Sequence, residues 1–171
     1  MDRDRLSRAF LALVRFLLAL NVAFVVVALV AFAATFAVHG MLEARLAAKY
    51  AGRAPEALAF VRALILLSLP TAAAVHVLFG GLAAILRSVL AGDPFVADNA
   101  ARLRSIGWSL LALQLTDLML GAIVAWGEAR GLDTIGWQPT LMGWLAVLVA
   151  FVLARVFTIG TRLREDAEGL V

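Results

Sequence analysis

An aspartate at position 117 is the residue whose chemistry most needs an explanation. It is the only charged residue between Ser105 and Gly127, in an otherwise apolar stretch. An ionised carboxylate in the middle of a membrane helix costs about 2.5–3.5 kcal/mol on insertion scales. A carboxylate at such a place is therefore expected to be paired with another group or to be protonated.

His76 is a candidate partner for Asp117. His76 lies eleven residues before Arg87, and Asp117 lies twelve residues after Ser105. At 1.5 Å per helical residue, both side chains are expected about 17 Å from the same membrane edge. The segments that carry them are joined by a short loop and are expected to be antiparallel neighbours. A contact between His76 and Asp117 is therefore geometrically allowed.

Gln114 and Thr116 flank Asp117 and complete a candidate intramembrane polar site with it and His76. Three interpretations of this site are open. It could be a structural clamp that holds two helices together, which is the interpretation we favour. It could be a ligand or ion pocket that opens near Pro70, where the helix lacks a backbone hydrogen bond. It could also be a protonation switch, because histidine titrates near neutral pH.

The sequence offers little for enzymatic chemistry. It has no cysteine and only two histidines, so thiolate metal sites and cysteine nucleophiles are excluded. It contains neither a glycine-rich phosphate loop nor an HExxH zinc motif, and Asp117 has no second carboxylate in the apolar segments. We therefore expect no enzymatic activity, no metal and no cofactor.

The apolar composition predicts the elements that carry these residues. Of the 171 residues, 64% are hydrophobic and 16% are charged, whereas soluble domains average about 45–50% and 25%. Charges are absent from residues 16–38, 63–86 and 134–154, and residues 105–127 carry only Asp117. Each stretch has the roughly 20 residues that a helix needs to cross a bilayer, and none alternates with the period of a strand. The sequence predicts an all-α fold: a single polytopic membrane domain over residues 1–171, built as a four-transmembrane-helix bundle.

The basic residues predict the orientation of this bundle. Ten of them lie in the N-terminal segment, the loop 87–104 and the tail 155–171, which share one side of the membrane, and five lie on the other side. The positive-inside rule then places both termini in the cytoplasm of a bacterium, with the protein in the inner (plasma) membrane. Trp126 and Trp137 are expected to mark the opposite interface, with Trp137 at the start of the fourth span.

The segments outside the spans carry further signals. Arg45, Lys49 and Arg53 recur every four residues in the loop 39–62, which predicts an external amphipathic helix that ends near Gly52. Side chains at positions 98 and 99 are expected to cap the third helix. The tail continues a helical apolar stripe beyond the fourth span, formed by Val156, Ile159, Leu163, Ala167 and Leu170.

Two groups of residues resemble a known family. Residues 92–95 (Gly-Asp-Pro-Phe), Asn99, residues 102–104 (Arg-Leu-Arg) and residues 106–108 (Ile-Gly-Trp) are similar to a pattern of the bacterial four-helix membrane family catalogued as domain of unknown function 2975. Residues 155–157, 160, 163–165 and 170–171 resemble its closing pattern. The resemblance implies the four-helix plan and brings no catalytic residues. Because this family is often encoded beside small helix-turn-helix regulators, the resemblance also implies a cytoplasmic regulator as a partner.

We expect an inner-membrane sensor, signalling or regulator-binding protein that presents its cytoplasmic loop and tail helix to a partner. The expected contact surface consists of loop and tail residues: Asp93, Pro94, Phe95, Asn99, Arg102, Arg104, Gly160, Leu163, Glu165 and Leu170. The alternative is a small transporter or ion-coupled carrier that uses His76 and Asp117 and works as a homo-oligomer, because four helices enclose little volume. A third option is a structural subunit of a larger complex. The basic residues lie at the membrane edges, so the lipid bilayer is an expected partner and direct nucleic-acid binding is not.

Overall fold

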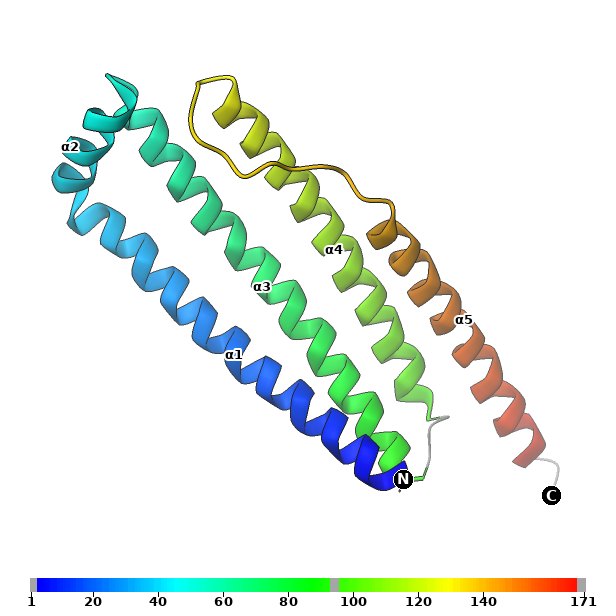
Figure 1. The fold of residues 1–171 in the computed structure, drawn as a ribbon. Coiled ribbons are helices and arrows are strands. Elements are labelled where there is room, and N and C mark those ends of the chain that lie inside the picture. Colours follow the sequence, from blue (N-terminus) through cyan, green and yellow to red (C-terminus); the bar gives the residue numbers. More distant parts are fainter. Residues whose placement is uncertain (1–2, 93–95, 169–171) are drawn as a thin grey trace.

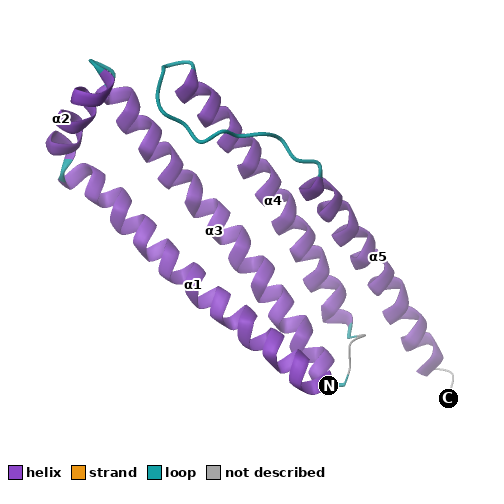
Figure 2. Cartoon of the chain, in the orientation of Figure 1, coloured by secondary structure: helices purple, strands orange, loops and turns teal. Residues whose placement is uncertain are grey.

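The computed structural model describes residues 3–92 and 96–168, and over these residues the chain is entirely helical apart from its connections. Its five helices, shown in Figures 1 and 2, are α1 (Arg3–Ala37), α2 (His39–Tyr50), α3 (Ala54–Leu90), α4 (Ala97–Glu128) and α5 (Met142–Glu168). Four of them contain apolar stretches long enough to cross a membrane: Ser7–Ala37, Ala54–Leu90, Asp98–Glu128 and Met142–Leu163. The predicted all-α class with four membrane-length helices is confirmed.

The four long helices lie side by side in chain order, each antiparallel to the next (Figure 1). In the described chain α1 contacts α3, α3 contacts α4 and α4 contacts α5, whereas α1 touches neither α4 nor α5. We call the end of this row that holds the N-terminus and the α3–α4 connection the terminal end. The end with α2 and the α4–α5 connection is the loop end.

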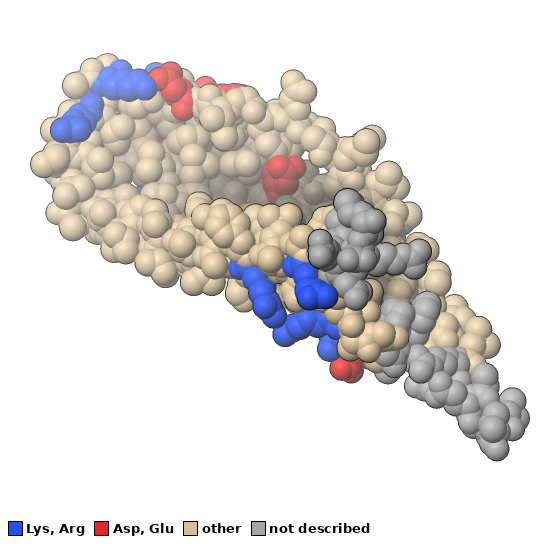
Figure 3. Space-filling view, turned by 60° about the horizontal axis from the view of Figure 1, so that its bottom comes forward, with Lys and Arg blue, Asp and Glu red and all other residues tan. Residues whose placement is uncertain are grey.

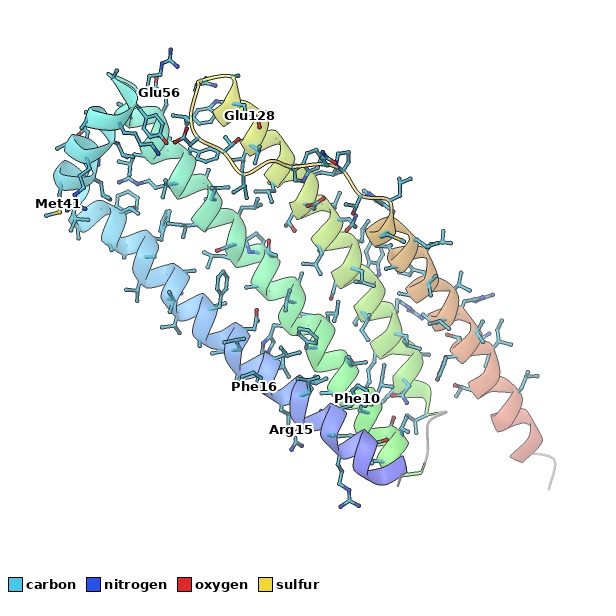
Figure 4. The ribbon with its side chains drawn as sticks, in the orientation of Figure 1. Phe10, Arg15, Phe16, Met41, Glu56 and Glu128 are labelled. Atoms are coloured by element: carbon cyan, nitrogen blue, oxygen red, sulfur yellow. The ribbon has the colours of Figure 1, made fainter. Side chains whose placement is uncertain are left out.

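The outermost helix α1 shows how this arrangement follows from the sequence. Val14, Ala28 and Thr35 are buried, and Asn21 of the same seven-residue series donates a hydrogen bond to the Ala72 carbonyl of α3 at 3.0 Å. Side chains on the opposite side are exposed, and Arg15 points away from α3 (Figure 4). A single contact stripe, with apolar side chains on the remaining surface from Phe16 to Val38, is what a helix needs when it has one long neighbour and is otherwise surrounded by lipid.

Arg62 fastens the end of α1 to α3. Its Nη2 donates to the Thr35 carbonyl at 2.8 Å, and its Nε donates to Thr35 Oγ1 at 3.1 Å. Its guanidinium also lies 4.0 Å from the centre of the Phe36 ring. The Thr35 carbonyl belongs to the last turn of α1, where helix carbonyls lack a partner within the helix. The sequence placed Arg62 in an external loop, but it lies in α3 and joins two helices.

The loop end has a small apolar core of its own. Ala57, Phe60 and Leu132 are buried there, and Tyr50 and Trp126 pack against them. The predicted helix in the first loop is confirmed as α2, which ends at Tyr50 and is followed by Ala51 and Gly52, both with positive φ. Two polar contacts close this end: Arg53 Nη1 donates to the Arg130 carbonyl, and Lys49 Nζ lies 2.6 Å from Asp133 Oδ2.

The boundaries of the third and fourth helices differ from the prediction. The fourth helix was expected from residue 134, but α5 begins only at Met142. Residues 129–141 form a connection that runs back along α4 (Figure 2). The third predicted helix corresponds to α4, which has Val96 as its N-cap and no side-chain cap. The expected capping by Asp98 and Asn99 is therefore wrong. The helix in the tail is confirmed, because α5 extends to Glu168.

The Lys49–Asp133 pair predicts a pH dependence at the loop end. The hydrogen bond from Lys49 lowers the pKa of Asp133 below its ordinary 3.8, and the same bond raises the pKa of Lys49 above its ordinary 10.5. The contribution of ionised Asp133 to the stability of the loop end is therefore complete above its ordinary pKa, and it is lost as the pH falls through the lowered pKa. The contribution of protonated Lys49 to this stability is complete below its ordinary pKa of 10.5, and it is lost as the pH rises through the raised pKa. We expect the 129–141 connection to loosen below about pH 4.

A spin label can measure this loosening, because the chain has no native cysteine. Ile135 is 65% exposed, so an Ile135→Cys label should become more mobile on acidification. Asp133→Asn should give high mobility already at neutral pH. Glu128 also faces this connection, since it accepts a hydrogen bond from Thr134 at 3.0 Å. The control is therefore Glu128→Gln, and a pH response that disappears in this variant but survives in Asp133→Asn would contradict the assignment.

Candidate functional site

Asp117 has a partner in the structure, and the partner is a tryptophan. The indole Nε1 of Trp137 donates to Asp117 Oδ1 at 3.2 Å. The Trp137 ring lies against Gly121, one helical turn from Asp117, where an added Cβ would be 2.7 Å from three ring atoms. Both Asp117 and Trp137 are half-buried. The carboxylate is thus held by a segment of the chain twenty residues further on.

The position of Trp137 corrects the expectation that it begins the fourth span beside Trp126. Trp137 packs between Asp117 and Gly121, which are five to nine residues from Trp126 along α4. That separation corresponds to about 8–14 Å of helix. Trp126 instead belongs to the core of the loop end, with the Arg130 guanidinium 4.1 Å from its ring.

The structure does not bring the four predicted polar residues together. His76 is exposed on α3, and among the described side chains it forms no hydrogen bond or ion pair with Asp117. Thr116 donates to the Leu113 carbonyl of its own helix at 2.9 Å. Gln114 lies against Gly143 in the first turn of α5. Only Gln114 and Asp117 therefore share a contact surface, and that surface faces the C-terminal part of the chain.

A regular series along α4 explains why these contacts form. Gly107, Gln114 and Gly121 are spaced by seven residues and lie on one face of the helix. They contact Phe151, Gly143 and Trp137, respectively. A small residue on one side of each pair lets the two segments approach closely, as in other membrane-helix contacts. We call Gly107, Gln114, Asp117 and Gly121 the α4 seam; the polar residues in it hold the chain that follows α4.

The ligand interpretation of the predicted site finds a cavity near Pro70 but no link to the carboxylate. The cavity, of about 430 Å³, lies between α3 and α4, and its lining includes Pro70, Val77, Trp108 and Ser109. His76 and Asp117 do not line it. Over the described residues there is also no group of three or more histidine, aspartate and glutamate side chains that could hold a metal ion.

Asn99 and Arg102, predicted to contact a partner, are engaged within the chain. Asn99 is completely buried and donates from Nδ2 to Ser88 Oγ at 2.6 Å, which joins α4 to the last turn of α3. Arg102 donates to Asn99 Oδ1 at 2.8 Å and to Asp98 Oδ2 at 3.3 Å. The expectation that Asn99 lies on a contact surface is therefore wrong, because a partner cannot reach a buried side chain.

The other residues of the predicted partner surface have different outcomes. Arg104 is exposed on α4, Gly160 is half-buried on α5, and Leu163 is 64% exposed. Asp93, Pro94, Phe95 and Leu170, together with the side chain of Glu165, lie outside the described residues. Among the predicted residues whose side chains are described, Arg104 and Leu163 are the accessible ones.

The fold and the α4 seam define an all-α protein with four membrane-length helices whose interior polar groups hold its segments together. Residues 45–171, about three quarters of the chain, match a family described as protein of unknown function (DUF2975). The chain belongs to this family, which confirms the resemblance found in the sequence motifs. No curated protein and no solved structure matches the chain.

Proposed function

We propose that this chain is a small membrane protein that presents the end of α5 to a cytoplasmic regulatory partner. The observation that carries the proposal is an exposed apolar stripe on α5, which extends farther than α4 at the terminal end. Phe151 packs against Gly107 near the terminal end. From that contact α4 has ten more residues, to Ala97, and α5 has 17 more, to Glu168, so the last seven residues of α5, about 10 Å, extend beyond α4. Val156, Ile159 and Leu163, with helical spacing, lie in the last turns of the apolar stretch Met142–Leu163 and are 56%, 47% and 64% exposed, and Leu163 lies beyond the end of α4.

The charges support an orientation with the terminal end in the cytoplasm. Lys and Arg gather on the face that Figure 3 turns forward, and a second, smaller group lies over α2. The basic residues of the terminal end whose side chains the structure describes are Arg8, Arg15, Arg87, Arg102, Arg104, Arg155 and Arg162. Positive charge in excess on one side favours the cytoplasm for that side.

An amphipathic helix with exposed apolar positions at i, i+3 and i+7 suits a partner with a hydrophobic groove. The family resemblance favours a small helix-turn-helix regulator as that partner. Holding such a regulator at the membrane would keep it from DNA, and a change in the packing of α5 against α4 would alter its release. The membrane protein itself needs no catalytic group for this role.

Co-purification from membranes of the native host tests the proposal. We expect a helix-turn-helix regulator to accompany the wild-type chain and to fall at least tenfold in a Leu163→Glu variant, because a charge on the stripe opposes groove binding. Phe10→Glu is the matched control, since Phe10 is an exposed apolar residue at the same end, on α1 (Figure 4). No regulator with the wild-type chain, or equal loss in both variants, would contradict the proposal.

The orientation has its own test. A single Leu163→Cys variant should react with a membrane-impermeant maleimide only after the membrane is opened, whereas Met41→Cys, at the exposed position on α2, should react in intact cells after passage of the outer membrane. The reverse pattern would place the tail helix outside the cytoplasm and exclude a cytoplasmic partner. The alternative function, a carrier that uses His76 and Asp117, stays a prediction. Among the described side chains, these two residues form no hydrogen bond or ion pair with each other that would favour it.

A further inference from the structure

We propose that a cavity between α4 and α5 at the terminal end binds the phosphate of an anionic phospholipid, whose acyl chain follows the neighbouring apolar groove. This inference goes beyond the proposed regulatory role and does not depend on it. The cavity has a volume of about 320 Å³. Three arginines line it, Arg104 from α4 and Arg155 and Arg162 from α5.

The cavity offers cationic donors for an anion, and its lining contains no carboxylate. Arg104, Arg155 and Arg162 make no hydrogen bond or ion pair with any side chain that the structure describes. The remaining polar lining residue is Thr158, whose hydroxyl already donates to the Ala154 carbonyl at 2.8 Å. Guanidinium groups bind phosphate oxygens through paired N–H donors, so three of them around one cavity fit a phosphate group.

An apolar groove continues from this cavity along the same two helices. It has a volume of about 550 Å³, and its lining includes Leu111, Trp144, Leu148 and Val152. The cavity and the groove share two lining residues, Phe151 and Arg155. From Arg155 to Trp144 the groove follows α5 for eleven residues, or about 16 Å, which is close to the hydrocarbon depth of one leaflet.

The combined shape distinguishes a phospholipid from free phosphate. Free phosphate would occupy the arginine cavity and leave the groove unused, whereas a phospholipid would fill both. The position along the helix suits this assignment, because Arg155 is the first charged residue after the uncharged run 134–154 and basic residues flank membrane spans at the headgroup layer. Basic pockets between membrane helices on the cytoplasmic side are typical sites for anionic headgroups.

The test measures thermal stabilisation of the purified full chain in a neutral detergent by short-chain phosphatidylglycerol, phosphatidylcholine or inorganic phosphate. We expect saturable stabilisation by phosphatidylglycerol and a binding constant at least tenfold weaker for phosphatidylcholine. Arg155→Gln should weaken phosphatidylglycerol binding about five- to tenfold, the effect of one basic residue at a membrane surface. Arg15→Gln, an exposed arginine at the same end on α1, should change it less than twofold.

A groove variant separates the two possible sources of phosphate. Leu148 is 61% exposed, so Leu148→Trp should keep the fold and obstruct the acyl chain, weakening phosphatidylglycerol binding at least fivefold. Stabilisation by inorganic phosphate that is lost in Arg155→Gln but unchanged in Leu148→Trp would assign the cavity to a free anion and overturn the lipid proposal. Equal weakening by Arg15→Gln and Arg155→Gln, or equal binding of phosphatidylcholine, would show non-specific adsorption and overturn it as well.

Discussion

Replacing Gly121 with leucine is expected to displace the Trp137 indole from α4 and to leave the Asp117 carboxylate without its hydrogen bond. Even a Cβ at position 121 would lie 2.7 Å from three atoms of the rigid indole ring, so the ring must move. Overpacking of this kind costs about 1–3 kcal/mol. Loss of the partner of a half-buried carboxylate adds about 1–3 kcal/mol. The free energy of unfolding, measured by titration from a mild detergent into SDS, should fall by about 2–6 kcal/mol.

A second glycine provides the control for this prediction. Gly80 lies within α3, and an added Cβ there would meet nothing within 4 Å. Gly80→Leu should therefore leave the free energy of unfolding unchanged or raise it slightly, because leucine favours a helix more than glycine does. Equal effects of Gly121→Leu and Gly80→Leu would show that Trp137 does not pack on α4.

The carboxylate can be examined separately from the packing. Asp117→Asn keeps an oxygen that accepts the Trp137 N–H and removes the charge, so it should be nearly neutral or stabilising. Asp117→Leu removes the acceptor and should leave the indole N–H without its partner. A loss of stability in Asp117→Asn as large as that in Asp117→Leu would mean that the negative charge itself is needed, for example to pair with a group outside the chain.

The distribution of charges predicted the helices well because the physical cause is simple. A membrane-length helix must exclude charged side chains, and the charge-poor stretches 16–38, 63–86 and 105–127 lie on α1, α3 and α4 with only Val38 beyond a helix end. The first-loop helix was also predictable, since Gly52 and Pro55 mark its end and the start of α3. Hydrophobicity alone could not locate the start of α5. Residues 134–141 are as uncharged as a span, but Pro139 disfavours a helix at its own position and at Gln138.

The candidate site was harder to predict for a geometric reason. Counting residues from the membrane edge placed Asp117 and His76 at the same depth, but it gives no information about which face of each helix they occupy. The series of small and polar residues that contains Gly107, Gln114 and Gly121 places Asp117 on the face toward the C-terminal segment. Its partner, Trp137, could not be recognised while residue 137 was assigned to a helix that starts at the membrane edge.

Removal of the Asn99 side chain is expected to destabilise the terminal end, as the Gly121 change destabilises the α4 seam. Asn99 is completely buried, and Asn99→Ala leaves the Ser88 hydroxyl and one donor of Arg102 without this partner. Ser88 keeps its bond to the Ile85 carbonyl and Arg102 keeps Asp98, so the cost is that of two lost hydrogen bonds. At about 0.5–1.5 kcal/mol each, the free energy of unfolding in the SDS titration should fall by about 1–3 kcal/mol. Asp98→Ala is the matched control, because Asp98 binds the same arginine but its side chain is 78% exposed.

The difference between these neighbours separates a structural role from a partner-binding role. Loss of the exposed Asp98–Arg102 pair should cost less than about 1 kcal/mol, since exposed ion pairs contribute little. In a double-mutant cycle, Asn99→Ala and Ser88→Ala should show a coupling of about 0.5–3 kcal/mol, because the two side chains share one hydrogen bond. If Asn99→Ala costs no more than Asp98→Ala, the buried contact does not hold α3 to α4. A normal free energy of unfolding in Asn99→Ala, with loss of the regulatory partner, would return this residue to the contact surface that the sequence predicted.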